Sequence, residues 1–512
     1  MNGAFIAVVD LGTTGVRCAV FDERAQLVAS AYREIGLTFP SPGWVEQDPA
    51  EMVASTAAVF REALGHGSVP AGEIMVVGVT NQRETVVAWD RGSGKAVYPA
   101  IVWQDRRTAD RCSELKAAGE EDWVRARTGL PLDPYFSATK LTWLFGHVPG
   151  LREKAERGDV LVGTVDSWLL WNLAGVHATD PTNASRTLLY DIHTGAWDDE
   201  LLDLFGVPRS CLPEVRPSVS AFGSTRADLL GVERPVAGVL GDQQAALFGH
   251  AAFEPGETKV TWGTGAFLLM NTGGTIVQSR HGLLATAAYA VPDGGVRYAL
   301  EGAVFVAGAA VQWLRDGLGV ISDAAETEAL AQGISSTDGV YFVPALTGLG
   351  APHWDPNARG TIVGLTRGTG RAHLARAALE AIAYQTHDLV RAMEADAGLT
   401  LPELRVDGGA AGNAFLCQFQ ADILGISVVR PEMVETTSLG AALAAGLSAG
   451  IWPDLAAVRA LPRSLTRFSP QETPYRSQLL DGWRCAVDRA RGWTASHGSH
   501  RAPPLDRGPS PS

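Results

Sequence analysis

Two short stretches of the chain follow the same order of predicted elements, although about half of the sequence separates them. Residues 8–22 read VVDLGTTGVRCAVFD, and residues 258–271 read TKVTWGTGAFLLMN. Each predicts a strand, a turn rich in glycine and threonine, and a second strand. Either turn alone is typical of an ordinary hairpin, because hairpin loops favour glycine. As a spaced pair they predict an internal repeat, with two similar domains that face each other across a cleft.

Short β-branched runs alternate with longer amphipathic segments along the chain, which is the pattern of an α/β fold. Residues 373–398 predict a helix, because apolar side chains from Leu374 to Met393 recur at helical spacing and Gly398 can end it. A chain of 512 residues exceeds the usual size of one domain. The clearest predicted strands are residues 5–10, 73–80, 85–90, 258–263, 340–345 and 403–409.

Charge and cysteine content argue against several classes of protein. The formal net charge is −14, with acidic and basic residues interspersed, so neither nucleic acid nor an anionic membrane is expected as a partner. Five cysteines without a Cys-x-x-Cys pair indicate neither a disulfide framework nor a zinc site, and favour the cytoplasm. The N-terminal run predicts a first strand rather than a signal peptide, and no window is apolar enough for a membrane span.

The segment VLGDQQAALFGH, residues 239–250, places an acid where an apolar strand meets a helix. One interpretation is that Asp242 caps the helix, because a short acidic side chain satisfies the free backbone N–H groups of the first turn. The other is that Asp242 is a catalytic carboxylate. This segment alone does not decide between them. At a helix N-terminus, the dipole is expected to keep Asp242 ionised at neutral pH.

The first glycine-threonine turn, Gly12 to Gly15, offers N–H groups and hydroxyls that can cradle phosphate oxygens. It is not a Walker A loop, since no Gly-Lys-Ser/Thr follows, and not a dinucleotide fingerprint, since a strand comes next. Asp10 precedes the turn at a strand end, where a carboxylate can hold Mg²⁺ through water. A simple turn-initiating role for Asp10 fits the local pattern equally well.

A second polar group follows the apolar strand at residues 73–80. Arg83 and Glu84 are by default a solvated pair, yet the buried character of the strand places them at the mouth of a sheet, where α/β proteins bind ligands. Together they offer donors and an acceptor, as neighbouring hydroxyl groups require. Trp103 and Tyr135 add an aromatic wall and a phenol, although each alone is more often a core residue.

Ten motifs occur along the chain in a specific order, from about Phe5 to about Arg489. With this series the chain resembles the glycerol kinases of the FGGY carbohydrate kinase family. A lone Gly-Thr-Thr would carry little weight, whereas the ordered series is very specific. The motifs are PGWVEQDP, GVTNQRET, AIVWQDRR, TGLPLDPYFSATK, TDPTNASRTLLYDIHT, GDQQAALFGH, YALEGAVFVAGAAVQWLRD, VPALTGLGAPHWDP, GLTRG and LRVDGGAAGNAFLCQFQADILG.

The resemblance implies an actin-like fold: two ribonuclease-H-type α/β domains with ATP and a polyol in the cleft between them. It implies that Asp242 is the catalytic base and Asp10 the acid associated with Mg²⁺. The implied polyol contacts are Arg83, Glu84, Trp103, Tyr135, Asp242, Gln243 and Phe267. The implied nucleotide contacts are Thr13, Thr14, Gly15 and Arg17 in the first hairpin, Thr264 in the second, and Gly308, Gln312, Gly409 and Asn413 around ADP.

Four residues depart from the pattern of that family. Leu11, Gly15 and Val16 stand where glycerol kinases usually carry a glutamine and two serines, which removes two hydroxyls near the phosphates. Backbone N–H groups can still bind phosphate, so an altered nucleotide affinity is expected rather than lost activity. Asp105 also differs from many relatives, with no obvious consequence at the level of sequence.

These features predict transfer of phosphate from ATP to glycerol, giving sn-glycerol 3-phosphate and ADP, with domain closure excluding water. A sister kinase for another polyol, a ketose or dihydroxyacetone would share the ATP motifs but differ at NQRET, IVWQ and DPYFS, which are present here in their glycerol version. A non-catalytic actin-like sensor or scaffold has no need of an acid at position 242 beside a polyol pocket.

The expected domain boundaries follow from the two hairpins. Residues 1–250 are expected to hold the polyol and the first phosphate hairpin, and residues 251–492 the nucleotide. Residues 493–512 are rich in Pro, Ser and Gly and are expected to be disordered. By analogy with relatives, a homodimer or homotetramer is expected.

Overall fold

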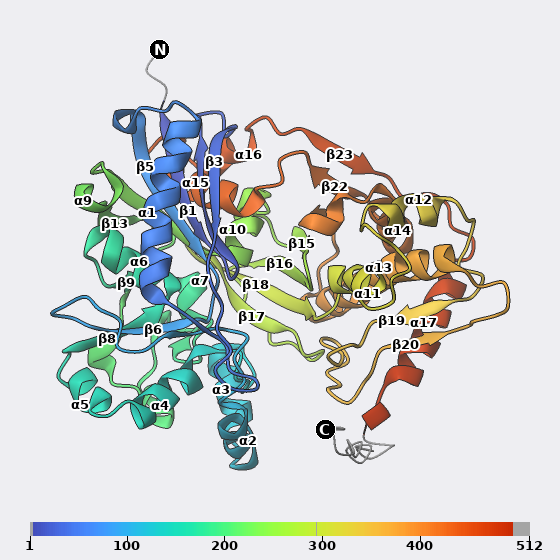
Figure 1. Cartoon of the computed structure of the whole chain (residues 1–512), viewed down its shortest axis with the longest axis horizontal. Coiled ribbons are helices and arrows are strands. Elements are labelled where there is room, and N and C mark those ends of the chain that lie inside the picture. Colours follow the sequence, from blue (N-terminus) through green and yellow to red (C-terminus); the bar gives the residue numbers. More distant parts are fainter. Residues whose placement is uncertain (1–3, 293, 495–512) are drawn as a thin grey trace, which may run out of the picture.

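The computed structural model describes residues 4–292 and 294–494. Two large mixed sheets, one toward the left and one toward the right of Figure 1, are flanked by helices. The strand order of the first sheet is β13 (Ala221–Ser224), β14 (Pro235–Gly241), β5 (Ile74–Asn81), β1 (Phe5–Leu11), β2 (Gly15–Phe21), β3 (Leu27–Glu34). That of the second is β17 (Leu284–Val291), β18 (Gly295–Val304), β16 (Ala266–Gly273), β15 (Thr258–Trp262), β21 (Leu404–Asp407), β22 (Val428–Pro431), β23 (Leu465–Phe468).

The two sheets share one internal arrangement. In the first, β1 pairs antiparallel with β2 and parallel with β5, while β3 extends the antiparallel side and β14 the parallel side. In the second, β15 pairs antiparallel with β16 and parallel with β21, while β18 and β22 extend the two sides. Each glycine-threonine turn joins the first antiparallel pair of its sheet. The predicted repeat and the predicted actin-like α/β fold are confirmed.

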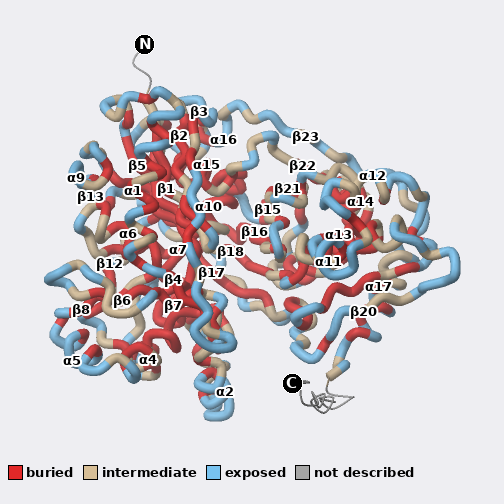
Figure 2. Tube along the Cα trace, viewed as in Figure 1, coloured by how far each residue is buried: buried red, intermediate tan, exposed pale blue. Residues whose placement is uncertain are grey.

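The first sheet is buried on both faces, which explains why FIAVVDL is an almost continuous apolar run. Ala7 and Val9 pack in a cluster with helices α1 (Pro49–His66) and α6 (Val165–Ala174). Ile6 and Val8 point the other way, into a cluster with α10 (Asp242–Gly249) and α15 (Thr436–Ser448). Buried segments concentrate where β1, β5 and α10 meet (Figure 2).

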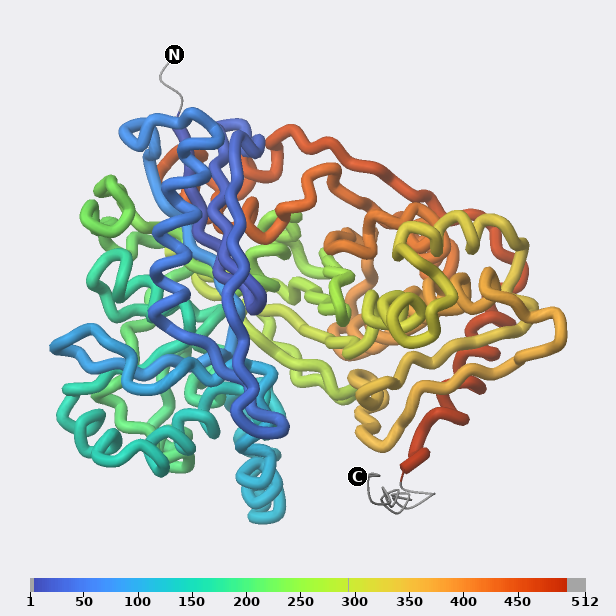
Figure 3. Tube along the Cα trace, viewed as in Figure 1, coloured from blue at the N-terminus to red at the C-terminus, as the bar shows by residue number. Residues whose placement is uncertain are grey.

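Helix α15 comes from the C-terminal part of the chain but packs on the first sheet. In Figure 3 its orange-red trace lies beside the blue strands of the N-terminal part. The contact is close because glycines line it: a Cβ at Gly440 would overlap the carbonyl of Ala245 in α10, and one at Gly249 would overlap that of Thr436. Helices α10 and α15 therefore cross with their backbones almost touching.

The two faces of the second sheet differ in polarity. One face packs an apolar cluster against α13 (Arg371–Ala397), α14 (Ala414–Leu424) and α17 (Arg476–Ala490). On the other face, cross-strand pairing aligns a row of polar and aromatic side chains, because directly paired residues share a face. These residues are Lys259, Thr261, Phe267, Glu301 and Asp407.

A smaller sheet stands beside the first one. Its order is β4 (Glu46–Gln47), β7 (Ala100–Ile101), β6 (Val86–Asp90), β8 (Val160–Thr164). Helices α4 (Ser137–His147) and α5 (Leu151–Glu156) share its apolar cluster, in the lower left of Figure 1. This region holds the aromatic residues that the sequence singles out.

Most predicted elements occur in the structure. The six predicted strands match β1, β5, β6, β15, β19 (Tyr341–Val343) and β21, and helix α13 ends at a left-handed Gly398 as predicted. All five cysteines are free, and four are buried. No helix among the described residues is long and apolar enough to cross a membrane. Of the tail predicted to be disordered, residues 495–512 lie outside the described residues.

The glycine crossing of α10 and α15 yields a stability prediction. Gly440→Ala is expected to lower the melting temperature, because overpacking of this kind costs about 1–3 kcal/mol. The matched control is Gly146→Ala in α4, an exposed helical glycine with open space around it, where alanine should be neutral or stabilising by up to about 1 kcal/mol. A Gly440→Ala protein that melts at or above the wild-type temperature in differential scanning calorimetry would contradict the close crossing.

Candidate active site

The apolar strand β5 leads into buried charged residues, not a solvated pair. Arg83 is 3% exposed and Glu84 is 1% exposed. The backbone of Glu84 is left-handed, with φ of 63°, a conformation that costs a non-glycine residue on the order of 1–3 kcal/mol. This sharp turn directly after the strand keeps both side chains inside the molecule.

Arg83 links the first sheet to the second. Its Nη1 donates to Glu301 Oε2 at 2.5 Å, and its Nη2 donates to Glu301 Oε1 at 3.0 Å. The same guanidinium donates to Gln244 Oε1 at 3.1 Å, and its Nε lies 3.3 Å from Asp242 Oδ1. The forked shape of arginine allows this bidentate pairing, so one side chain connects β18, α10 and the turn after β5.

Arg186 and Glu301 complete the buried cluster, although the sequence did not single them out. Arg186 Nε donates to Glu84 Oε1 at 2.6 Å, and its Nη2 donates to Glu301 Oε1 at 2.9 Å. Burial alone would raise the pKa of Glu301, but Arg186 and Arg83 outweigh it and lower that pKa to about 2. Arg186 Nη1 is buried without an acceptor in the described part of the chain, which leaves one donor for a ligand oxygen.

Asp242 is the first residue of α10, directly after β14. The position before the helix belongs to Gly241, and Asp242 Oδ1 accepts a 2.7 Å hydrogen bond from the N–H of Gln243. The acid therefore lies within the first turn rather than in the expected cap position. Burial raises its pKa, although Arg83 and the Gln243 N–H oppose the shift. The helix N-terminus favours the charged form, but burial acts against it and has the larger effect on the pKa, so ionisation of Asp242 at neutral pH stays a prediction.

Gln243 and Lys259 join α10 to β15. Lys259 Nζ donates to Gln243 Oε1 at 2.5 Å and to Thr261 Oγ1 at 2.8 Å. The lysine is fully buried, and the sequence did not predict it as a site residue. Its position as the one charged residue of the strand TKVTW is a signal that could have marked it.

The predicted aromatic wall assembles next to this cluster. The rings of Trp103 and Tyr135 meet edge to face, with centroids 5.6 Å apart, and the Arg186 guanidinium lies 5.8 Å from the Tyr135 ring centre. Trp103 Nε1 donates to Thr13 Oγ1 at 2.8 Å. Phe267 pairs with Ala303, two residues beyond Glu301 on the same sheet face. Trp103 and Tyr135 thus lie between the charged cluster and the first hairpin.

The first hairpin is a tight turn whose backbone carbonyls accept hydrogen bonds. Gly12 N–H donates to the Gly15 carbonyl at 2.9 Å, Gln47 Nε2 donates to the Thr13 carbonyl at 2.6 Å, and Gln82 Nε2 donates to that of Gly12 at 3.3 Å. Thr14 is exposed at the tip. These bonds use the carbonyls of the turn and leave its tip open to a ligand.

The three residues of this hairpin that differ from the usual glycerol kinase pattern have different surroundings. Leu11 and Val16 are buried in the apolar core of the first sheet, so a hydroxyl at position 16 would face that core. Gly15 is different, because a Cβ there would overlap the phenol of Tyr32. The Tyr32 ring also lies 5.5 Å from the Arg17 guanidinium carbon. In this chain a tyrosine occupies the space that a serine at position 15 would need.

Asp10 and Arg17, paired across β1 and β2, both meet the start of α15. Ser438 Oγ donates to Asp10 Oδ2 at 3.0 Å, and Arg17 forms an ion pair with Glu435. Burial raises the pKa of Asp10 to about 6 against the Ser438 hydrogen bond, and the charge of Asp242 adds to the rise. The two acids predicted for metal and for base therefore lie within each other's electrostatic reach.

The second hairpin packs against the start of helix α11 (Gly308–Asp316). Gly308 N–H donates to the Gly263 carbonyl at 2.9 Å, and Ala309 N–H donates to that of Thr264 at 3.0 Å. Thr264 is exposed at the turn, and Gln312 is exposed on α11. A Cβ at Gly308 would lie 2.6 Å from the Gly263 carbonyl oxygen, so this approach requires glycine.

The glycine-rich turn after β21 reaches the end of β15. Gly408, with φ of 87°, is so close to Trp262 that a Cβ would lie 2.6 Å from its carbonyl oxygen, while Gly409 beside it has open space. Asn413 caps α14, accepting from the Leu416 N–H at 3.0 Å. No hydrogen bond among residues 4–292 and 294–494 joins Gly409 or Asn413 to either hairpin, so their nucleotide role stays a prediction.

Asp105 has a structural consequence that the sequence did not reveal. It is 1% exposed and accepts from the Val45 N–H at 2.6 Å, and Arg107 donates to both of its oxygens. The Arg107 guanidinium carbon lies 3.9 Å from the ring centre of Trp44 and 4.6 Å from that of Trp143. Asp105 thus anchors the loop that carries Trp44.

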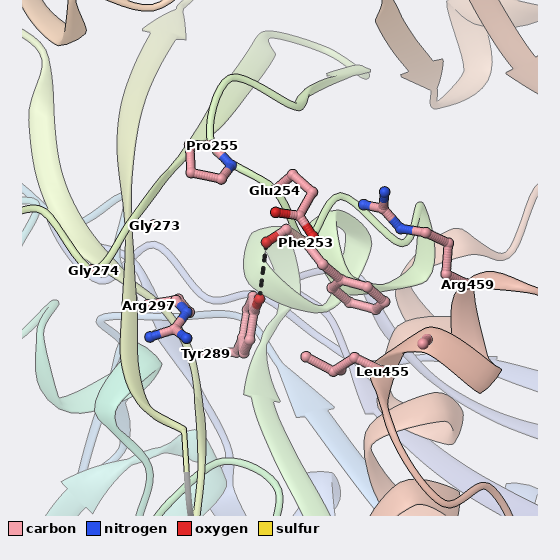
Figure 4. Close-up of a pocket in the computed structure, with 10 residues that line it drawn as sticks. Phe253, Glu254, Pro255, Gly273, Gly274, Tyr289, Arg297, Leu455 and Arg459 are labelled. Atoms are coloured by element: carbon pink, nitrogen blue, oxygen red, sulfur yellow. Dashed lines mark hydrogen bonds between the residues drawn. The ribbon is translucent and has the colours of Figure 1, made fainter.

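A cavity of about 520 Å³ opens elsewhere, between the α10–β15 connection and α16 (Leu455–Arg459). Figure 4 shows Arg297 and Arg459 on opposite sides of it, with Tyr289 donating a hydrogen bond to the Phe253 carbonyl. Arg459 is already paired with Glu257. None of the predicted site residues lines this cavity, so it is separate from the charged cluster.

The two sheets share the arrangement of their central strands, and a buried ionic cluster joins them beside a glycine-threonine hairpin. These features define an actin-like protein with its candidate site between the sheets. Family models confirm and narrow this class. The FGGY family of carbohydrate kinases matches with its N-terminal domain over residues 5–249 and with its C-terminal domain over residues 258–449. The chain belongs to the FGGY family of carbohydrate kinases.

Similar proteins agree with this assignment. A glycerol kinase of Paraburkholderia phymatum is 52% identical over 496 residues, which cover 96% of this chain and 99% of that protein. Glycerol kinase 2 of Thermotoga maritima is 53% identical over 492 residues, with the same coverage. Among solved structures, Plasmodium falciparum glycerol kinase with ADP has a TM-score of 0.90 at 37% identity, covering 95% of this chain and 98% of the other.

The buried cluster predicts a specific loss of stability. Glu301→Gln leaves Arg83 and Arg186 buried with less compensating charge, which costs about 3–5 kcal/mol. Because the folded pKa of Glu301 is about 2 and its ordinary value is 4.5, its contribution is present above pH 4.5 and is lost as the pH falls toward 2. The melting-temperature gap between wild type and Glu301→Gln should therefore be smaller at pH 3 than at pH 7.

A matched control is Glu114→Gln, which removes an exposed i,i+3 ion pair with Arg111 and should change stability little. A Glu301→Gln gap no larger than this control would show that the cluster does not stabilise the fold. A gap independent of pH between 7 and 3 would show that the lowered pKa of Glu301 does not contribute to stability.

Proposed function

We propose that this chain transfers the γ-phosphoryl group of ATP to a terminal hydroxyl of glycerol, giving sn-glycerol 3-phosphate and ADP. The observation that carries the proposal is the hydrogen bond from Trp103 to Thr13 at 2.8 Å. It joins the predicted polyol wall to the predicted phosphate hairpin, so an alcohol and a phosphate could meet there. The curated relatives described above, which are glycerol kinases, support this choice of acceptor.

We assign the binding of glycerol to the charged cluster and its aromatic wall. Arg83 and the free Nη1 of Arg186 donate hydrogen bonds to hydroxyl oxygens, and Glu84 accepts from hydroxyl protons. Trp103 and Phe267 pack on the carbon atoms, and Tyr135 offers a neutral phenol whose pKa burial raises further above physiological pH. The prior pairing of the charged groups holds them in position before the substrate arrives.

Asp242 is assigned the role of general base. Its carboxylate aims the attacking hydroxyl and accepts its proton while the oxygen bonds to the γ-phosphorus and the bond to ADP breaks. Phosphoryl transfer mainly requires positioning and charge neutralisation. Thr13, Thr14, Gly15, Arg17 and Thr264 supply donors from the two hairpins, and Gly308, Gln312, Gly409 and Asn413 are the proposed ADP contacts.

Asp10 fits an Mg²⁺ ion. Ser438 engages one carboxylate oxygen, and Asp242 adds negative charge that a cation would balance. Mg²⁺ usually takes one or two carboxylates together with phosphates and water, and no cluster of three or more His, Cys, Asp or Glu ligands occurs in the described parts of the chain. When bound, the ion would neutralise charge on the transferring phosphate.

We further propose that the first and second sheets belong to domains bounded at residues 1–250 and 251–492, and that the enzyme acts in the cytoplasm as a homodimer or homotetramer. The five free cysteines support a reducing compartment. The oligomeric state rests on analogy with relatives, and sedimentation velocity would measure it.

Coupled ADP-release assays with glycerol, other polyols, ketoses and dihydroxyacetone test the proposed activity. Glycerol should have the highest kcat/KM, and Asp242→Asn should reduce turnover on the order of 10²–10⁴-fold. The control is Asp203→Asn, the same change at an exposed position of α8 (Asp199–Phe205), which should leave turnover unchanged. Preference for another acceptor would move the chain to a sister kinase, and no acceptor-dependent turnover would indicate a sensor or scaffold.

Titration of Mg²⁺ tests the role of Asp10. Asp10→Asn should raise the Mg²⁺ concentration required for half-maximal turnover, because the variant loses the carboxylate charge that attracts the ion. The KM for glycerol should change little. An unchanged Mg²⁺ requirement would remove Asp10 from the metal site.

A further inference from the structure

Lys259 is a buried cation whose position packing alone does not explain. Its Nζ donates to Gln243 Oε1 at 2.5 Å and Thr261 Oγ1 at 2.8 Å. None of the carboxylates in residues 4–292 and 294–494 forms a salt bridge with it. Removing an ammonium from water costs several kcal/mol when no counter-charge contacts it, and burial lowers the pKa of Lys259 to about 8.

Acidic side chains lie near Lys259 but outside salt-bridge distance. Asp407, Asp242 and Glu301 act on its charge from the same region, and Arg83 opposes them. Lys259 and Asp407 lie on one face of the second sheet, which faces α10. The ammonium is thus retained as a cation next to the proposed base, with its hydrogen bond directed to a neutral amide.

That hydrogen bond determines how the Gln243 amide is oriented. An ammonium only donates, so the amide must turn its oxygen toward Lys259. The planar amide then directs its Nε2 to the opposite side. Gln243 is half-buried at the start of α10, next to Asp242. Its free donor and the carboxylate acceptor of Asp242 therefore come from adjacent residues.

We propose that Lys259 is a positioning residue that makes Gln243 a hydrogen-bond donor to the substrate hydroxyl. The proposal rests on the proposed glycerol kinase function. A hydroxyl held by both residues accepts from Gln243 Nε2 and directs its own proton to Asp242. Without Lys259 the amide can rotate by 180° and present its oxygen, which competes with Asp242 for that proton.

A double-mutant cycle tests this proposal in the full-length enzyme, with Lys259→Met, Gln243→Ala and the double variant. Lys259→Met should lower kcat/KM for glycerol on the order of 10²-fold, as misplacement of a substrate contact does, while the KM for ATP stays near the wild-type value. In the Gln243→Ala background the same change should have little further effect, because the residue through which Lys259 acts is gone. Additive losses in the double variant would overturn the proposal.

A further variant tests whether Lys259 orients the Gln243 amide or only holds α10 against β15. Gln243→Glu keeps a partner for Lys259 as an ion pair but offers the substrate an acceptor instead of a donor. It should lose kcat/KM for glycerol although its melting temperature stays close to that of wild type. Wild-type kcat/KM in Gln243→Glu would overturn the donor role.

Two controls separate the possible failures. Lys154→Met, on an exposed position of α5, should leave all kinetic constants unchanged. The wild-type arm reports on the proposed function: absence of glycerol phosphorylation there overturns that function and, with it, this role of Lys259. Glycerol turnover in wild type with an equal kcat/KM in Lys259→Met overturns the role of Lys259 alone.

Discussion

The bidentate pairing of Arg83 with Glu301 is the interaction on which the candidate site depends. It joins the turn after β5 to β18 of the second sheet, and Arg186 extends it to Glu84. Each of these side chains would be costly to bury alone, since an unpaired buried charge is strongly destabilising. The cluster can therefore form only when the two sheets have one relative position. The same relative position brings Asp242, Trp103 and the first hairpin close to the cluster.

Much of the fold could be predicted from local sequence signals. The two glycine-threonine hairpins and the apolar strands depend on short-range periodicity and turn chemistry, and both are present in the structure at the predicted places. Helix α13 could be predicted for the same reason, because it has an amphipathic stripe and ends at a left-handed glycine. Asp242 and Arg83 were identifiable because polar residues interrupt or follow apolar runs at strand ends.

The residues that were missed depend on contacts distant in sequence. Glu301 and Lys259 lie inside strands, where one charged residue resembles an ordinary solvent-facing position, and their partners are in other elements. The helix dipole was expected to keep Asp242 ionised. Burial acts against it by raising the pKa, and this burial depends on packing that residues 239–250 do not reveal. Tyr32 fills the space beside Gly15 from another strand, so it too required the structure.

The packing of α15 on the first sheet has a consequence for how the protein is made. On one face of that sheet, Ile6 and Val8 pack in an apolar cluster with α10 and α15. During translation α15 emerges about 190 residues after α10, a delay on the order of 10–40 s at ordinary rates of synthesis. Through that interval the nascent N-terminal region exposes the apolar surface that α15 will cover, so this core is completed only near the end of synthesis.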